Sequence, residues 1–165
     1  MTVVIKHSRK SRLSAMIDEP GGVSVGVALQ RAETNLSARR AESQTIVAER
    51  VAELIAQPEP AADPASVADA LARAYASASA VIDAASPFEL DDLCAAAAGL
   101  CDLIDAAPAD RPFDWRLVTV HAQAMQVLLA LPVEQVAARQ AVMQGLREVL
   151  VKKLGPDALD PAFPA

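Results

Sequence analysis

Aromatic residues are scarce in this chain, at 3% of its 165 residues, with three phenylalanines, one tryptophan and one tyrosine. A surface that binds nucleic acid combines a basic stripe with aromatic side chains that stack on the bases. The formal net charge is −6, and basic residues cluster only in a short N-terminal arm. We therefore expect no nucleic-acid partner, and a core built from leucine, valine, isoleucine and alanine.

Long apolar runs and a set of paired cysteines are also missing. No run approaches the roughly 18 residues that a membrane span needs, and the N-terminus lacks the apolar segment of a signal peptide. Cys94 and Cys101 lie seven residues apart on a predicted helix, about 10 Å along its axis, which is too far for a disulfide. These absences predict a cytoplasmic protein without a membrane span, whose two cysteines are reduced core thiols.

Recognisable catalytic and cofactor motifs are absent as well. The sequence has no Gly-rich phosphate loop, no Gly-x-Ser-x-Gly elbow and no His-Glu-x-x-His. Two cysteines without a histidine on the same helix do not supply the three or four ligands that zinc requires. Asp102 and Asp105 could form a carboxylate pair, but a solvated acidic face explains them more simply. We predict a protein that is not an enzyme and has no catalytic residue, cofactor or metal.

Helix signals, in contrast, are abundant after residue 58. Asp63 with Pro64, and Ser86 with Pro87 and Glu89, have the residue types that begin helices, the second pair as a capping box. Asp114 is the expected cap of a third helix, and a fourth follows Pro132 and ends at Gly155. Apolar residues recur at three- and four-residue steps in all four segments. The pattern predicts an all-α fold, with an antiparallel bundle of about four helices over residues 58 to 165 and a short loose C-terminal tail.

A long amphipathic helix is predicted before the bundle, over residues 23 to 57, with Ser24 as its cap. Arg39, Arg40 and Ser43 interrupt its apolar stripe, so we expect the helix either to reach beyond a compact body or to form a homodimer with a copy of itself. Three prolines within residues 58 to 64 predict a linker and a domain boundary. The predicted domains are therefore residues 1 to 22, 23 to 57 and 58 to 165.

Residues 1 to 22 form a basic arm with no helical period beyond a turn or two. One interpretation is a solvated, partly disordered tail. The other is a linear motif that docks on an acidic partner and becomes ordered there. The candidate protein-binding residues of this motif are Arg9, Lys10, Arg12 and Leu13.

His121 is the one candidate for group transfer, because it lies about two turns into the third helix of the predicted bundle. Histidine phosphotransfer modules carry an exposed imidazole on such a helix, and a ring nitrogen accepts the phosphoryl group. Their motif continues with lysine and glycine, whereas Ala122 and Gln123 follow here. His121 is therefore either a phosphoryl acceptor or a partly buried structural histidine, and the missing residues favour the second.

Two patches of residues together suggest a family. They comprise Ser11-Arg12-Leu13, Ile17, Pro20-Gly21-Gly22, Ala28-Leu29, Ala32-Glu33 and Asn35-Leu36, and then Leu100-Cys101-Asp102-Leu103, Asp114-Trp115, Val120-His121 and Leu128. In these patches the chain resembles the CheE family of alphaproteobacterial chemotaxis proteins, although residues 95 to 99 are poorer in bulky side chains than this family leads us to expect. The resemblance implies a non-enzymatic accessory protein of a chemotaxis or related two-component pathway. Its partners would be a receiver domain or a kinase.

A different class of protein remains open. Alanine-rich amphipathic helices also coat apolar granules, as in phasin-like proteins, and they do so with a broad exposed apolar stripe. Here prolines and caps break the helices every twenty residues or so, which favours a closed bundle. Strong binding of a hydrophobic dye to the folded protein would indicate a coat, and weak binding a closed bundle.

Overall fold

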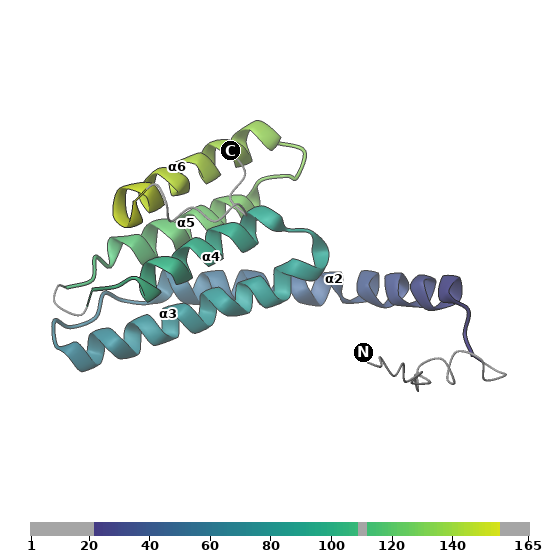
Figure 1. The fold of residues 1–165 in the computed structure, drawn as a ribbon, viewed down its shortest axis with the longest axis horizontal. Coiled ribbons are helices and arrows are strands. Elements are labelled where there is room, and N and C mark those ends of the chain that lie inside the picture. The colour runs from purple at the N-terminus through teal and green to yellow at the C-terminus, as the bar shows by residue number, and fades with distance from the viewer. Residues whose placement is uncertain (1–21, 109–111, 156–165) are drawn as a thin grey trace, which may run out of the picture. The chain divides into compact units, whose positions relative to one another are not determined.

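The fold is all-α, as the sequence predicts. The computed structural model describes residues 22 to 108 and 112 to 155, and these contain no strand. The helices are α2 (Val25–Ala56), α3 (Pro64–Ala85), α4 (Asp91–Asp105), α5 (Arg116–Ala130) and α6 (Val136–Leu154), with a short 3₁₀ turn, η1 (Ser86–Phe88), after α3. The chain forms two compact units, residues 1 to 38 and 39 to 165. In the second unit successive helices alternate in direction, as an antiparallel bundle does (Figure 1).

Three helix ends lie where local sequence signals place them. The Ser24 hydroxyl accepts a hydrogen bond from the amide of Val27 at the start of α2. The Asp63 carboxylate accepts one from the amide of Ser66, with Pro64 in the first turn of α3. Helix α6 ends at Gly155, whose φ of 96° suits a residue without a Cβ, and Lys152 and Lys153 occupy its last turn. These three predictions are confirmed.

The capping box predicted at Ser86 is wrong. Ser86 instead ends α3, the 3₁₀ turn follows, and α4 begins only at Asp91. Glu89, the expected reciprocal cap, has a left-handed backbone with φ of 58°. Phe88 is buried between these segments, with the guanidinium of Arg40 5.3 Å from its ring centre. The capping box does not form because Ser86 still belongs to the end of α3, where its amide donates to the carbonyl of Ile82.

The predicted cap of α5 is wrong in a similar way. Helix α5 begins at Arg116. Trp115 is its N-cap residue, and the Trp115 side chain makes no capping hydrogen bond. Asp114 instead accepts hydrogen bonds from Nε of Arg116 at 2.9 Å and from Nζ of Lys153 at 3.1 Å. The two cations hold the pKa of the Asp114 carboxyl well below its usual range, through hydrogen bonds first from Arg116 and then from Lys153. This carboxylate therefore links the start of α5 to the end of α6 and does not cap a helix.

Helix α4 is central in the second unit, where it packs against α3, α5 and α6. Many of the side chains at these contacts are alanines, and small side chains let helices approach closely. The larger buried residues come from every helix of the unit, and among them are Val81, Leu93, Leu100, Trp115, Val118, Met125, Leu128 and Leu146. A core of aliphatic side chains and alanine is therefore confirmed.

The second half of α2 belongs to this core. Val47, Val51 and Leu54 are buried in the same cluster as the residues of α3 to α6. Close by, the Ser43 hydroxyl donates a hydrogen bond to the carbonyl of Ala84. The compact unit therefore begins at Arg39, within the long helix, and not at the prolines near residue 58. Pro58 and Pro60 lie in the connection from α2 to α3, and Pro64 is the first residue of α3.

The described part of the first unit consists of residues 22 to 38, and its helical portion is the beginning of α2. All of these residues are exposed. The predicted basic arm falls almost entirely in residues 1 to 21, which lie outside the described part of the chain. Across the described ranges, no helix combines the length and the apolar character that crossing a membrane requires.

Candidate functional site

A groove with a volume of about 660 Å³ lies between the start of α4 and the first turns of α6. Two kinds of side chain line it. The apolar ones come from the segment before α4, the connection between α5 and α6, and α6 itself, and they are Leu90, Val133, Val136 and Met143. The polar ones are Glu89, Asp91, Asp92, Arg139, Gln140, Gln144 and Arg147. Most of these positions lie near the ends of helices, where the bundle leaves side chains uncovered.

Arg139 fixes the geometry of the groove. Its Nε donates a hydrogen bond to Oδ2 of Asp92 at 2.5 Å, and this contact ties α6 to the first turn of α4. Its Nη1 donates to the carbonyls of Leu128 at 2.7 Å and Leu131 at 2.6 Å. A cation at these carbonyls satisfies acceptors that the end of α5 leaves free and complements its negative dipole end. Arg139 thereby connects three helices while only 10% of its side chain is exposed.

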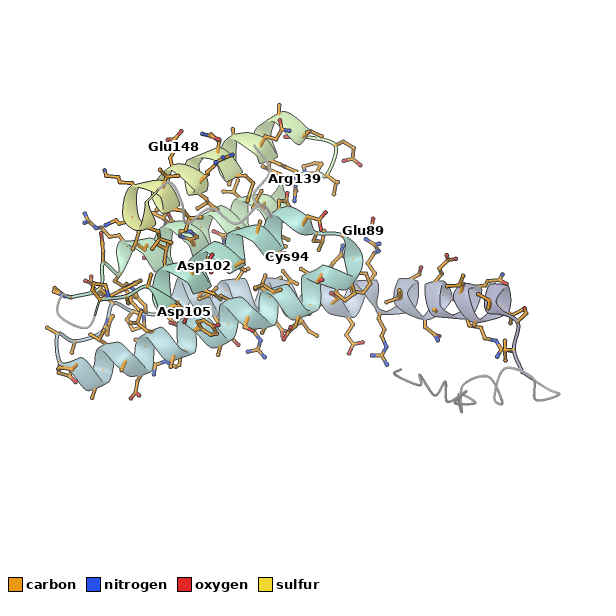
Figure 2. All side chains as sticks on the ribbon, viewed as in Figure 1. Glu89, Cys94, Asp102, Asp105, Arg139 and Glu148 are labelled. Atoms are coloured by element: carbon orange, nitrogen blue, oxygen red, sulfur yellow. The ribbon has the colours of Figure 1, made fainter. Side chains whose placement is uncertain are left out.

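Glu89 lies at the edge of the groove in an unusual backbone conformation. Figure 2 shows it on the segment before α4, with Arg139 on α6. A left-handed φ of 58° at a residue with a Cβ costs about 1 kcal/mol. Strained residues of this kind are common at binding sites, because the surrounding structure must hold them in place. The Glu89 amide donates to the carbonyl of Ser86, which keeps the turn closed.

Two valines give the groove an exposed apolar part. Val133 is 67% exposed and Val136 is 56% exposed, whereas Leu90 and Met143 are half-buried. The apolar spacing of the last helix predicts Val136 for the core, and the structure corrects this. Glu89 and Asp91, beside the valines, are also exposed. The groove therefore combines an apolar surface with accessible negative charge, which suits a helical segment that is apolar on one side and basic at its flank.

His121, unlike the valines of the groove, is fully buried, with 0% of its surface exposed. Its Nδ1 lies 2.8 Å from the carbonyl of Leu117, and since a carbonyl only accepts, Nδ1 carries the proton. The other ring nitrogen, Nε2, is buried without a hydrogen-bond partner. Phosphoryl transfer requires a ring nitrogen that the donor can reach. The folded bundle provides no such access, so the structure favours the structural interpretation of His121.

Burial also lowers the pKa of His121, because the interior disfavours the charged imidazolium more than the hydrogen bond to Leu117 favours it. The unfolded chain then binds a proton near pH 6.5 that the folded chain does not bind until a lower pH. We expect the contribution of the neutral His121 to the free energy of unfolding to be fully present above pH 6.5. It should be lost as the pH falls through the lowered pKa. The contribution is at most about 1.4 kcal/mol per pH unit.

His121→Leu should remove this contribution, since leucine has no proton to gain. Urea unfolding of both proteins between pH 7.5 and pH 5 measures it. The difference in unfolding free energy between wild type and variant should change with pH below 6.5 and stay constant above it. A difference that is constant over the whole range would contradict the buried, neutral imidazole.

Both cysteines are free thiols, as predicted. Burial, followed by the charges of Asp105 and Asp102, raises the pKa of Cys101 to about 11. Burial, followed by the charges of Asp91 and Asp92, also raises the pKa of Cys94, which is partly buried. The thiolate is the reactive form of cysteine, so neither side chain has the environment of a nucleophile. Among the described residues, no group of histidine, cysteine and acidic side chains could hold a metal ion.

The predicted protein-binding residues Arg9, Lys10, Arg12 and Leu13 lie outside the described residues, and their role stays a prediction. The groove, in contrast, was missed by sequence reasoning. Val133 and Val136 follow Pro132 closely, in the connection before α6 and at its first residue. Apolar residues at the start of a helix are the one sequence signal that could have indicated exposed apolar side chains here. Nothing in the sequence indicates that Arg139 turns inward.

No protein-family model, no curated protein and no solved structure matches this chain.

Proposed function

We propose that this chain is a non-enzymatic accessory protein of a bacterial chemotaxis or related two-component pathway, and that it acts by binding another protein in the groove between α4 and α6. The exposed Val133 and Val136, beside accessible carboxylates, are the observation that carries the binding role. The pathway rests on the resemblance to the CheE family, and the cytoplasmic location is the expectation drawn from the sequence, which predicts no membrane span. A receiver domain or a chemotaxis kinase is the expected class of partner.

The chemistry of the buried side chains supports a protein-binding role rather than an enzymatic one. His121 and Cys101 are the buried groups whose pKa values shift, and burial is the main cause in both cases. A catalytic acid, base or nucleophile must reach its substrate. The accessible groove instead offers apolar side chains, carboxylates, amides and two guanidinium groups, those of Arg139 and Arg147, a mixture that is typical of a surface for another polypeptide.

The groove favours one kind of binding segment. Its exposed valines would contact the apolar face of an amphipathic helix, at positions spaced three and four residues apart. Glu89 and Asp91 would meet lysine or arginine at the flank of that helix. Because such charges lie at the rim, we expect them to affect the association rate and the salt dependence more than the final affinity.

Val136→Glu should weaken binding to the receiver domain or kinase at least tenfold, because it places a buried charge in an apolar contact. The matched control is Val127→Glu on α5, since Val127 is 45% exposed, compared with 56% for Val136, and does not line the groove. Isothermal titration calorimetry with receiver domains and kinases of the same source measures both. Equal affinities of the two variants would rule out the groove as the binding site.

Deletion of residues 1 to 22 separates the groove from the predicted arm. If the arm residues Arg9, Lys10, Arg12 and Leu13 carry the interaction, the deletion abolishes binding and Val136→Glu leaves it unchanged. Transfer of label from a phosphorylated partner to wild type, but not to His121→Gln, would replace the binding role by phosphotransfer. Absence of both binding and transfer, with every receiver domain and kinase of the source, would overturn the proposed function.

A further inference from the structure

An apolar stripe at the start of α2 lacks a partner. Its residues are Val25, Leu29, Ala32 and Leu36, separated by four, three and four residues, which is the spacing of the core positions of a coiled coil. Val25 is 76% exposed, Leu29 59% and Leu36 45%, and Ala32 is exposed as well. In the following residues Arg39 occupies the next position of the pattern and ends the stripe.

The first unit contains no other described element that could cover this stripe. Its helical portion is the first fourteen residues or so of the 32-residue helix α2, and most of the stability of a helix in a protein comes from packing of its apolar face. A contiguous exposed apolar surface is also a common mark of an interaction site. We therefore expect this part of α2 to be fully stable only when its stripe is covered.

We propose that the stripe is a dimerisation surface, covered by the same stripe of a second copy in the antiparallel direction. In this register Val25 lies against Leu36 of the second copy, and Leu29 lies against Ala32 of the second copy. By symmetry the same two pairs form again on the other side of the twofold axis, which passes between Gln30 and Arg31. All four stripe positions of each copy then face an apolar side chain.

Side-chain size favours the antiparallel direction. A large residue, Leu29, meets a small one, Ala32, and such pairing fills space evenly along an interface. A parallel pair in register would place Ala32 opposite Ala32 and leave a gap between two leucine layers. It would also place Arg39 opposite Arg39 at the next core position, where like charges repel. Antiparallel helix dipoles add to the preference.

The residues that flank the stripe fit the same register. Gly26 and Ala28 are small, and a Cβ at Gly26 would meet nothing within 4 Å in the single chain. The antiparallel direction places Glu33 on the same edge of the interface as Gly26 of the second copy, and Ala28 on the same edge as Asn35 of the second copy, so no like charges lie at the same level along the four layers. The two helices can therefore approach closely without an electrostatic penalty.

The length of the stripe limits the strength of the dimer. Stable interfaces generally bury more than about 1,200 Å² in total, and two helical segments of four turns bury less than that. We therefore expect a reversible dimer with a dissociation constant in the micromolar range. The inference does not depend on the groove, because Val136 and the stripe are on different helices and Val136→Glu leaves the stripe intact.

Sedimentation equilibrium of the full chain tests the surface. The wild type should rise from the monomer mass of 17.3 kDa toward twice that value as its concentration increases. Leu29→Glu and Leu36→Glu should remain monomeric, with at least a tenfold weaker association. Val27→Glu is the matched control, since Val27 is 41% exposed and lies on the other side of the same helix, and it should dimerise like the wild type. A wild type that stays monomeric at several hundred micromolar, or a control that behaves like Leu29→Glu, would overturn the proposal.

Cross-linking tests the direction. Under mild oxidation, Leu29→Cys mixed with Ala32→Cys should give a disulfide-linked heterodimer faster than either protein alone gives a homodimer. The wild type, with its shielded Cys94 and Cys101, sets the background. Rapid cross-linking of Ala32→Cys to itself would indicate a parallel pair and would contradict the antiparallel register.

Discussion

Arg139→Ala is expected to lower the free energy of unfolding by about 3 to 5 kcal/mol, the usual effect of removing one partner of a buried ion pair. The substitution leaves the carboxylate of Asp92 without its partner at 2.5 Å. It also removes the donor to the carbonyls of Leu128 and Leu131, which lie at the end of α5. The carboxylate and the two carbonyls thus lose their shared cation, and α4, α5 and α6 lose the side chain that contacts all three.

Urea unfolding at pH 7, followed by circular dichroism, measures the effect. Arg139→Lys is an informative second variant, because an ammonium cannot reproduce the fork of Nε and Nη1 donors and should recover only part of the loss. Arg116→Ala is the matched control, since the Arg116 side chain is 88% exposed although it also contacts a carboxylate, that of Asp114. We expect the control to change stability little. An Arg139→Ala variant as stable as this control would show that the buried contacts contribute nothing.

Leu54→Ala is expected to destabilise the bundle by about 3 kcal/mol, because it removes buried methyl groups and leaves a cavity. Leu54 is 2% exposed and belongs to the core cluster that joins α2 to the other helices of the second unit. Neighbouring Ile55 is 40% exposed and is the natural control. Both substitutions create alanine within the same helix, so differences in helix propensity are small and burial decides the outcome.

Thermal and urea unfolding of the two variants give this comparison directly. Ile55→Ala should stay within about 1 kcal/mol of the wild type, as substitutions away from the core generally do. Equal effects at the two positions would mean that α2 is not part of the compact unit. The domain boundary would then lie near residue 58, where the prolines of the sequence place it.

The sequence predicted a large share of the fold because many of the signals are local. Ser24, Asp63 and Gly155 lie at helix ends, and the hydrogen bonds that define the first two join residues only three apart. At Ser86 the same reasoning failed. Ser86 ends α3, with its amide bonded to the carbonyl of Ile82, and the chain passes through a 3₁₀ turn that contains the buried Phe88 before α4 begins. The residue types of a helix start therefore do not show by themselves whether the preceding helix continues up to that point.

The candidate sites show the same limit. His121 and Val136 both follow the apolar spacing of their helices, yet one is fully buried and the other is 56% exposed. Spacing indicates which residues share a helical face, but it does not indicate how far the neighbouring helices extend over that face. The groove exists because the packed helices leave the first turns of α6 uncovered beside the start of α4.

The sequence by itself determined that this protein is helical, that its core is aliphatic, and where most helices begin and end. These properties depend on residue type and on spacing within a few turns. Only the tertiary structure decided that half of the long helix enters the core, that Arg139 turns inward, and that His121 is fully buried. The physical reason is that burial is a property of contacts between helices, and these contacts join residues far apart in the chain.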